Sequence, residues 1–111
     1  MKIFEEIKNN SDDFERFCRE NHVVTMYAFG SSTNSTFDQQ SSDIDVMVKV
    51  DIQDPVERGE SLLSLWNALE SLFKRKVDLI TESSLRNPYL KNSIDATKVL
   101  IYDGSRQKIS A

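Results

Sequence analysis

Two predicted strands, joined by a polar segment that begins with a glycine, limit most strongly what this chain can fold into. The apolar and β-branched residues 23–29 stop at Gly30, and a second such segment spans residues 43–50. Segments of this length and composition are typical of β-strands, and the glycine marks the turn that ends the first one. The polar residues 31–42 between them predict a loop or a short helix. The chain is therefore expected to contain a sheet.

Helical and strand-like patterns alternate along the rest of the chain. Apolar residues at helical spacing predict two short helices, or one with a break, near the N-terminus, and Asp54-Pro55 is a strong start for a long helix. The expected helices cover about 2–20, 55–74 and 87–94, and the further strands cover 76–80 and 98–102. This order predicts an α/β (α+β) fold: one mixed four-stranded sheet with helices packed against it. We expect a single domain over residues 1–111, with a frayed tail over about 105–111.

The composition narrows the possible partners. The 18 acidic and 14 basic residues give a net charge of −4, so direct nucleic-acid binding, which depends on an excess of cations, is not expected. No apolar run reaches the ~20 residues that span a bilayer, and the N-terminus lacks an apolar signal core. The single cysteine, Cys18, fits a reducing cytoplasm and is expected in the core. In this acidic chain a polyphosphate ligand would need local positive charge, for which metal ions are the natural source.

Three aspartates in the predicted strands are candidate metal ligands. Asp43 and Asp45 are two residues apart, so they project from the same face of their strand, and Asp78 lies inside the third strand. Carboxylate oxygens suit Mg²⁺, and three carboxylates can hold two ions that act on a phosphate. If Gly30 lies beside them, free N–H groups there could hold phosphate oxygens. Taken separately, these residues could also be solvated acids at a strand end and an ordinary turn.

The ordered set of motifs resembles the nucleotidyltransferase superfamily of DNA polymerase beta. The segments AFGSS, SSDIDVMV and KVDLI follow its pattern of Gly-Ser, Asp-x-Asp and a later strand Asp. The short chain and the ending SLRNPYLKNSIDATKVLIYDG resemble its minimal (MNT) branch, so the resemblance covers about residues 22–104. The resemblance implies a nucleotidyltransferase fold. The site residues that it implies are Gly30, Ser31 and Ser32 at the nucleotide, and Asp43, Asp45 and Asp78 as catalytic metal ligands.

The same resemblance implies a function. Its members transfer a nucleoside monophosphate, so we expect AMP transfer from ATP to a hydroxyl, with two Mg²⁺ ions as cofactors. In the MNT branch the acceptor is a partner HEPN-domain toxin, which makes the MNT protein an antitoxin. Many relatives carry a basic residue and a glycine just after Gly-Ser, but residues 32–35 read Ser-Thr-Asn-Ser. A binding module that masks a partner without chemistry is therefore an alternative. Antibiotic nucleotidylation is less favoured, because 111 residues leave little room for a drug-binding domain.

Overall fold

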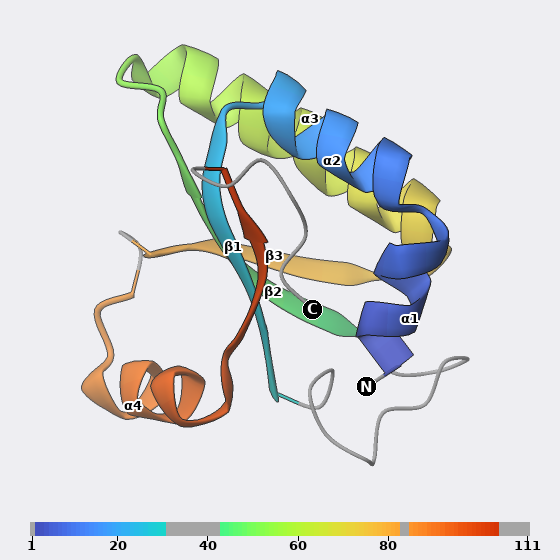
Figure 1. Cartoon of the computed structure of the whole chain (residues 1–111). Coiled ribbons are helices and arrows are strands. Elements are labelled where there is room, and N and C mark those ends of the chain that lie inside the picture. Colours follow the sequence, from blue (N-terminus) through green and yellow to red (C-terminus); the bar gives the residue numbers. More distant parts are fainter. Residues whose placement is uncertain (1, 31–42, 83–84, 105–111) are drawn as a thin grey trace.

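A four-stranded mixed sheet with helices packed against it forms the body of the protein (Figure 1), which confirms the predicted fold class. The structure, a computed structural model, describes residues 2–30, 43–82 and 85–104. The strand order is β3-β2-β1-β4; β1 is antiparallel to β2 and β4, and β2 is parallel to β3. The elements are α1 (Lys2–Asn9), α2 (Ser11–Glu20), β1 (Val23–Phe29), β2 (Ile44–Val50), α3 (Pro55–Phe73), β3 (Val77–Thr81), α4 (Pro88–Thr97) and β4 (Val99–Asp103).

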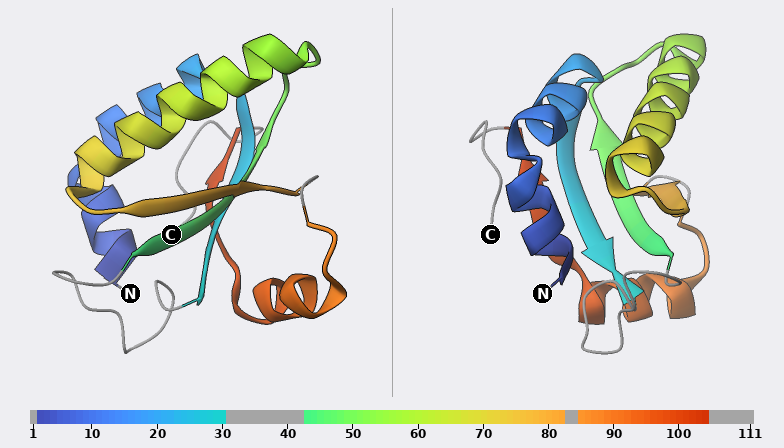
Figure 2. Two further views of the ribbon diagram at one scale, coloured as in Figure 1. Left: turned by 180° about the vertical axis from the view of Figure 1, so that it is seen from behind. Right: turned by 90° about the vertical axis from the view of Figure 1, so that its right-hand side faces the viewer.

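One face of the sheet is covered by α2 and α3, as the views in Figures 1 and 2 agree. The apolar side chains of this face alternate along the strands, as Ile44, Val46 and Val48 do in β2, and each is at most 1% exposed. They form one core with Phe14 of α2 and with the buried face of α3. Because this core takes up one side of each strand, the intervening side chains are left on the other face, where a site can form.

Side-chain caps fix where two helices begin, as the sequence predicts. The Asp54 carboxylate accepts a hydrogen bond of 3.0 Å from the Glu57 N–H at the start of α3. The Asn87 side chain accepts from two backbone N–H groups in the first turn of α4. That helix continues to Thr97, one turn further than its sequence predicts. Within the described residues, no helix combines the length and the apolar character that a membrane crossing requires.

Trp66 belongs to the apolar stripe of α3, whose spacing in the sequence predicts a buried position, yet the residue is 37% exposed. Its indole N–H donates to the Val77 carbonyl over 2.6 Å, and the Glu70 carboxylate accepts from the Val77 N–H over 3.0 Å. The polar end of an indole needs such a partner, which keeps the ring at the sheet edge. Two side chains of α3 therefore hold the first residue of β3, directly before Asp78.

Candidate active site

Asp45 and Asp78 lie side by side on neighbouring parallel strands. Asp45 of β2 pairs in register with Asp78 of β3, and on its other side it pairs with Phe29 of β1. Register partners on adjacent strands, about 4.8 Å apart, point to the same face of a sheet. The two carboxyl groups share a hydrogen bond. The sheet thus brings together two of the aspartates that the sequence singles out, from positions far apart in the chain.

The surroundings of Asp45 make its ionisation unfavourable. Its pKa rises from 3.8 to about 6, first because partial burial removes water from the carboxylate, then because of the charge and hydrogen bond of Asp78, and last because of the charge of Asp43. Asp43 precedes β2 and is half-buried. All three aspartates therefore interact electrostatically at one end of the sheet, and a positive ion there would relieve their repulsion.

Gly30 allows the backbone at the end of β1 to lie close to the Asp45 carboxylate. Its φ is +65°, and a Cβ at this position would lie 2.9 Å from Asp45 Oδ2, so only a glycine fits without displacement. The Gly30 N–H donates to Thr97 Oγ1 of α4 over 3.2 Å, and this hydroxyl donates in turn to the Ser93 carbonyl over 3.1 Å. The glycine turn is thus attached to the last turn of α4. Ser31 and Ser32, which the sequence also predicts at the nucleotide, lie outside the described residues.

The donor chemistry of the aspartates fits Mg²⁺, because hard divalent cations prefer carboxylate oxygens. Within the described ranges, no group of three or more His, Cys, Asp or Glu side chains is closely enough arranged to hold a metal ion. Asp45 instead shares a hydrogen bond with Asp78, and the charge of Asp43 raises the pKa of Asp45 further. The structure therefore supplies carboxylate oxygens that suit a cation, and a bound cation would lower the raised pKa of Asp45. Among the described residues, these carboxylates are not arranged around one common centre.

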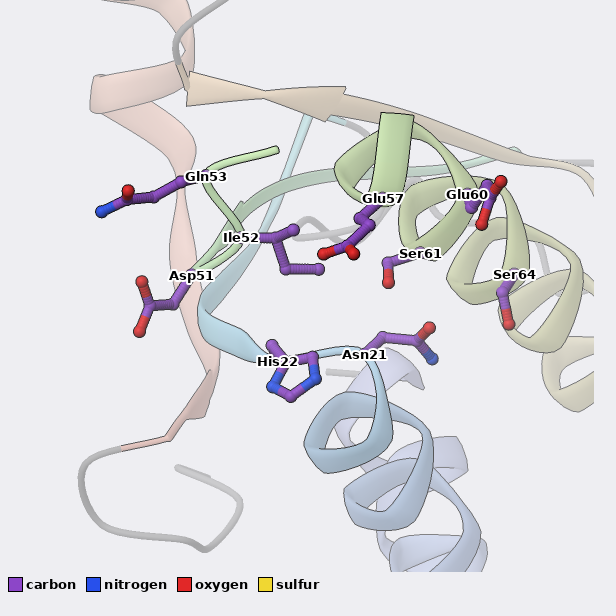
Figure 3. A pocket seen from close by; sticks show the side chains of 9 residues that line it. All are labelled: Asn21, His22, Asp51, Ile52, Gln53, Glu57, Glu60, Ser61 and Ser64. Carbon is purple, nitrogen blue, oxygen red and sulfur yellow. The ribbon is translucent and has the colours of Figure 1, made fainter. Parts of the chain in front are cut away.

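A large open pocket of about 610 Å³ lies elsewhere (Figure 3). It is lined by residues from the α2–β1 junction, the β2–α3 connection and the first turns of α3. That end of the sheet is where Val23 pairs with Val50, whereas Phe29 pairs with Asp45 at the other end. The pocket and the aspartates are thus separated by the length of the strands, and we do not assign the pocket to the same site.

The structure adds residues that the sequence does not single out. Thr97 binds the glycine turn, and the Lys98 ammonium lies 5.0 Å from the centre of the Tyr27 ring, on the face of the sheet that carries the aspartates. Both come from the junction of α4 and β4, inside the C-terminal segment whose resemblance to the MNT branch assigns no role to either residue. The side-chain alternation of β1 could have placed Tyr27 on this face, but nothing in the sequence indicates which segment lies beside it.

Known proteins share this architecture. The pattern common to nucleotidyltransferase domains matches residues 11–101. A Methanocaldococcus jannaschii protein named "Putative protein adenylyltransferase MJ1217" is 34% identical over 101 residues, which span 91% of this chain and all of that protein. A chain in the crystal structure of a toxin–antitoxin with AMP-PNP superimposes with a TM-score of 0.62 at 26% identity, over 85% of this chain and 73% of that one.

A second solved structure supports the fold alone. It is a complex of tri-AMPylated Shewanella oneidensis HEPN toxin with MNT antitoxin, in which one chain has a TM-score of 0.52 at 23% identity, over 96% of this chain and 76% of that one. The matched pattern covers most of the chain, and the relative from M. jannaschii is matched over its whole length. The chain therefore belongs to the nucleotidyltransferase domain family and is an enzyme.

Proposed function

We propose that this protein transfers AMP from ATP to a hydroxyl group of a partner protein, and that the partner is a HEPN-type toxin. The observation that carries the chemistry is the register pairing of Asp45 with Asp78 directly beside the turn at Gly30. The M. jannaschii relative's name supports a protein acceptor, and the toxin–antitoxin structure with AMP-PNP supports an adenine nucleotide and a toxin partner. The HEPN identity rests on the resemblance to the MNT branch.

In this proposal each aspartate has a role that its position allows. Asp43 and Asp45 would hold both Mg²⁺ ions, and Asp78 would hold the ion nearer the acceptor hydroxyl. When bound, the ions would lower the pKa of the hydroxyl and offset the charge that develops on the α-phosphate. The acceptor oxygen forms a bond to the α-phosphorus, the bond to the β-phosphate breaks, and pyrophosphate and a proton leave. Gly30, Ser31 and Ser32 would position the phosphates.

The test is AMP transfer to candidate partners, followed by mass spectrometry of the intact proteins with ATP and Mg²⁺. Asp43→Asn and Asp45→Asn are expected to abolish the gain of AMP while leaving the thermal unfolding midpoint unchanged or higher. Asp51→Asn, at an exposed position beyond the other end of β2, is the matched control and should retain wild-type transfer. Full transfer by either site variant would overturn the assigned roles.

The alternative is a binding module that masks its partner without chemistry, and the missing basic residue after Gly-Ser favours it. Calorimetry separates the two functions, because a masking module needs no nucleotide. Metal-dependent binding of ATP together with AMP transfer supports the enzyme. Tight partner binding with neither would establish the module and overturn our proposal.

A further inference from the structure

The backbone of Lys98 lies at the carboxylate end of the sheet. Val99, the first residue of β4, pairs with Ala28, so Lys98 lies beside Phe29 at the end of β1. Phe29 in turn pairs with Asp45. Neighbouring strands are about 4.8 Å apart, which places the Lys98 backbone about 10 Å from that of Asp45. A lysine has a long flexible stem, so its ammonium can act within this space.

The side chain of Lys98 is on the same face as the aspartates. Its ammonium nitrogen lies 5.0 Å from the centre of the Tyr27 ring, and Tyr27 pairs with Met47. Met47 is two residues beyond Asp45 in β2, so the two share a face. Figure 1 shows α4, whose end carries Lys98, away from α2 and α3, which cover the other face. The ammonium therefore lies over the face that carries the aspartates and not in the core under α2 and α3.

A small cavity of about 200 Å³ adjoins this position. Two lysines, two carboxylates and two apolar side chains line it among the described residues: Lys91, Lys98, Glu82, Asp95, Met47 and Leu85. Because Met47 is in the wall, the cavity lies next to the Asp45 position along β2. It offers space beside the aspartates, with the lysine ammonium groups balanced by two carboxylates in the same wall.

We propose that Lys98 binds the phosphate chain of the nucleoside triphosphate at this site, an inference that rests on the proposed function. A triphosphate beside three aspartates, in a chain of net charge −4, needs positive charge from the protein as well as from metal ions. Residues 32–35 carry none. Thr97 binds the Gly30 N–H, so phosphates held at the glycine turn would lie next to the following residue, Lys98.

The ammonium of Lys98 is available to an anion. Its partner in this structure is Asp95, at 3.0 Å and three residues earlier in the chain, and the two side chains are 34% and 45% exposed. Exposed pairs of this kind contribute little, so a triphosphate of higher charge can replace Asp95 as the partner. The hydrogen bond with Asp95 raises the pKa of Lys98 above its usual value, so the group is charged across the neutral range.

Lys76 is the competing cation. It precedes Asp78 by two residues, and alternation places it on the same face. It lies at the entry to β3, however, and β2 separates that strand from β1 and the glycine turn. Lys98 enters β4, which is directly beside β1. Phosphates at Gly30 would therefore be nearer to Lys98.

The test compares calorimetric binding of ATP and of AMP, each with Mg²⁺, to the full chain. Lys98→Met is expected to weaken ATP binding about tenfold, the loss of one charge-assisted contact, and to change AMP binding by less than about twofold. Lys98→Arg should retain most of the ATP affinity. Lys49→Met, an exposed position on the same strand face toward the other end of β2, is the matched control and should bind ATP as the wild type does.

For a second variant we expect a change in ATP affinity of opposite sign. Asp95→Asn frees the ammonium from its carboxylate partner and should strengthen ATP binding about two- to threefold, but should have no effect when Lys98 is replaced by methionine. A purely structural role of Lys98 would not produce this coupling. Thermal unfolding of every variant checks that the fold is kept.

The inference is overturned if Lys98→Met binds ATP as the wild type does, if it weakens AMP and ATP binding equally, or if Lys76→Met shows the larger loss. It is also overturned if the wild type does not bind ATP. Failure of this inference can be told apart from failure of the proposed function. If the wild type transfers AMP and Lys98→Met binds ATP as the wild type does, only the role of Lys98 is overturned. Nucleotide binding that needs Lys98, without transfer to any protein, would instead overturn the proposed function.

Discussion

Replacing Asp78 by asparagine should stabilise the metal-free protein while it abolishes transfer. The folded-state pKa of Asp45 is about 6, above its ordinary value of 3.8, because of burial and of the charge and hydrogen bond of Asp78. The folded state therefore holds this proton more tightly than the unfolded state does. The stability that results is fully present below about pH 4 and is lost as the pH rises to about 6. The new amide side chain would carry no charge against Asp45 and, unlike the ionised Asp78 carboxylate, could donate a hydrogen bond to it.

The size of the effect follows from the pKa. The rise from 3.8 to about 6 corresponds to at most about 3 kcal/mol, at 1.36 kcal/mol for each pKa unit. Burial is the largest cause and remains in the variant, and the half-exposed carboxylate is screened by solvent. We therefore expect Asp78→Asn to raise the free energy of unfolding by about 1 kcal/mol at pH 8.

The assay is urea unfolding of the wild type and of Asp78→Asn in EDTA, at pH 4 and at pH 8. The gain should appear at pH 8 and shrink at pH 4, where Asp45 of the wild type is protonated. Asp51→Asn, which removes an exposed carboxylate distant from the pair, should show no such pH dependence. A variant that is less stable than the wild type at pH 8, or a gain that is equal at both pH values, would refute the reasoning.

Three further substitutions test the surroundings of the site and the core. Gly30→Ala should cost about 1–2 kcal/mol and reduce nucleotide transfer, because it strains a φ of +65° and places a Cβ 2.9 Å from Asp45 Oδ2; urea unfolding and the transfer assay measure the two effects. Trp66→Phe should cost about 1 kcal/mol of unfolding free energy in urea, because it removes the 2.6 Å hydrogen bond to the Val77 carbonyl. Leu69→Ala should cost about 2–5 kcal/mol in thermal or urea unfolding, because this side chain is fully buried.

The strands were the most predictable part of this fold. Residues 23–29 are all apolar or β-branched except the aromatic Tyr27, and Gly30 ends them, so local composition determines both limits of β1. The Asp54 cap sets the start of α3 in the same local way. The extra turn of α4 could not be predicted, because the contact of its last residue, Thr97, with Gly30 joins positions 67 residues apart.

The aspartates of the candidate site could be singled out from the sequence as candidates, but the register that pairs two of them could not. Alternation alone places Asp43 and Asp45 on one face of a strand. The pairing of Asp45 with Asp78 depends on a parallel register, and a slip of one residue would move Asp78 to the core face. The fate of Trp66 shows the same limit. Its spacing indicates a buried position, whereas the need of its N–H for a partner keeps it at the sheet edge.

The attachment of β3 explains why the carboxylate repulsion persists. Both backbone groups of Val77 are bound by side chains of α3, the N–H by Glu70 and the carbonyl by Trp66. Asp78 follows directly, so the strand cannot slide to move its carboxylate away from Asp45 without breaking these bonds. With the backbone held in this way, a proton or a bound cation between the carboxyl groups relieves the repulsion. Since the pKa of Asp45 is about 6, the proton is mostly lost at neutral pH, and a cation becomes the effective means of relief.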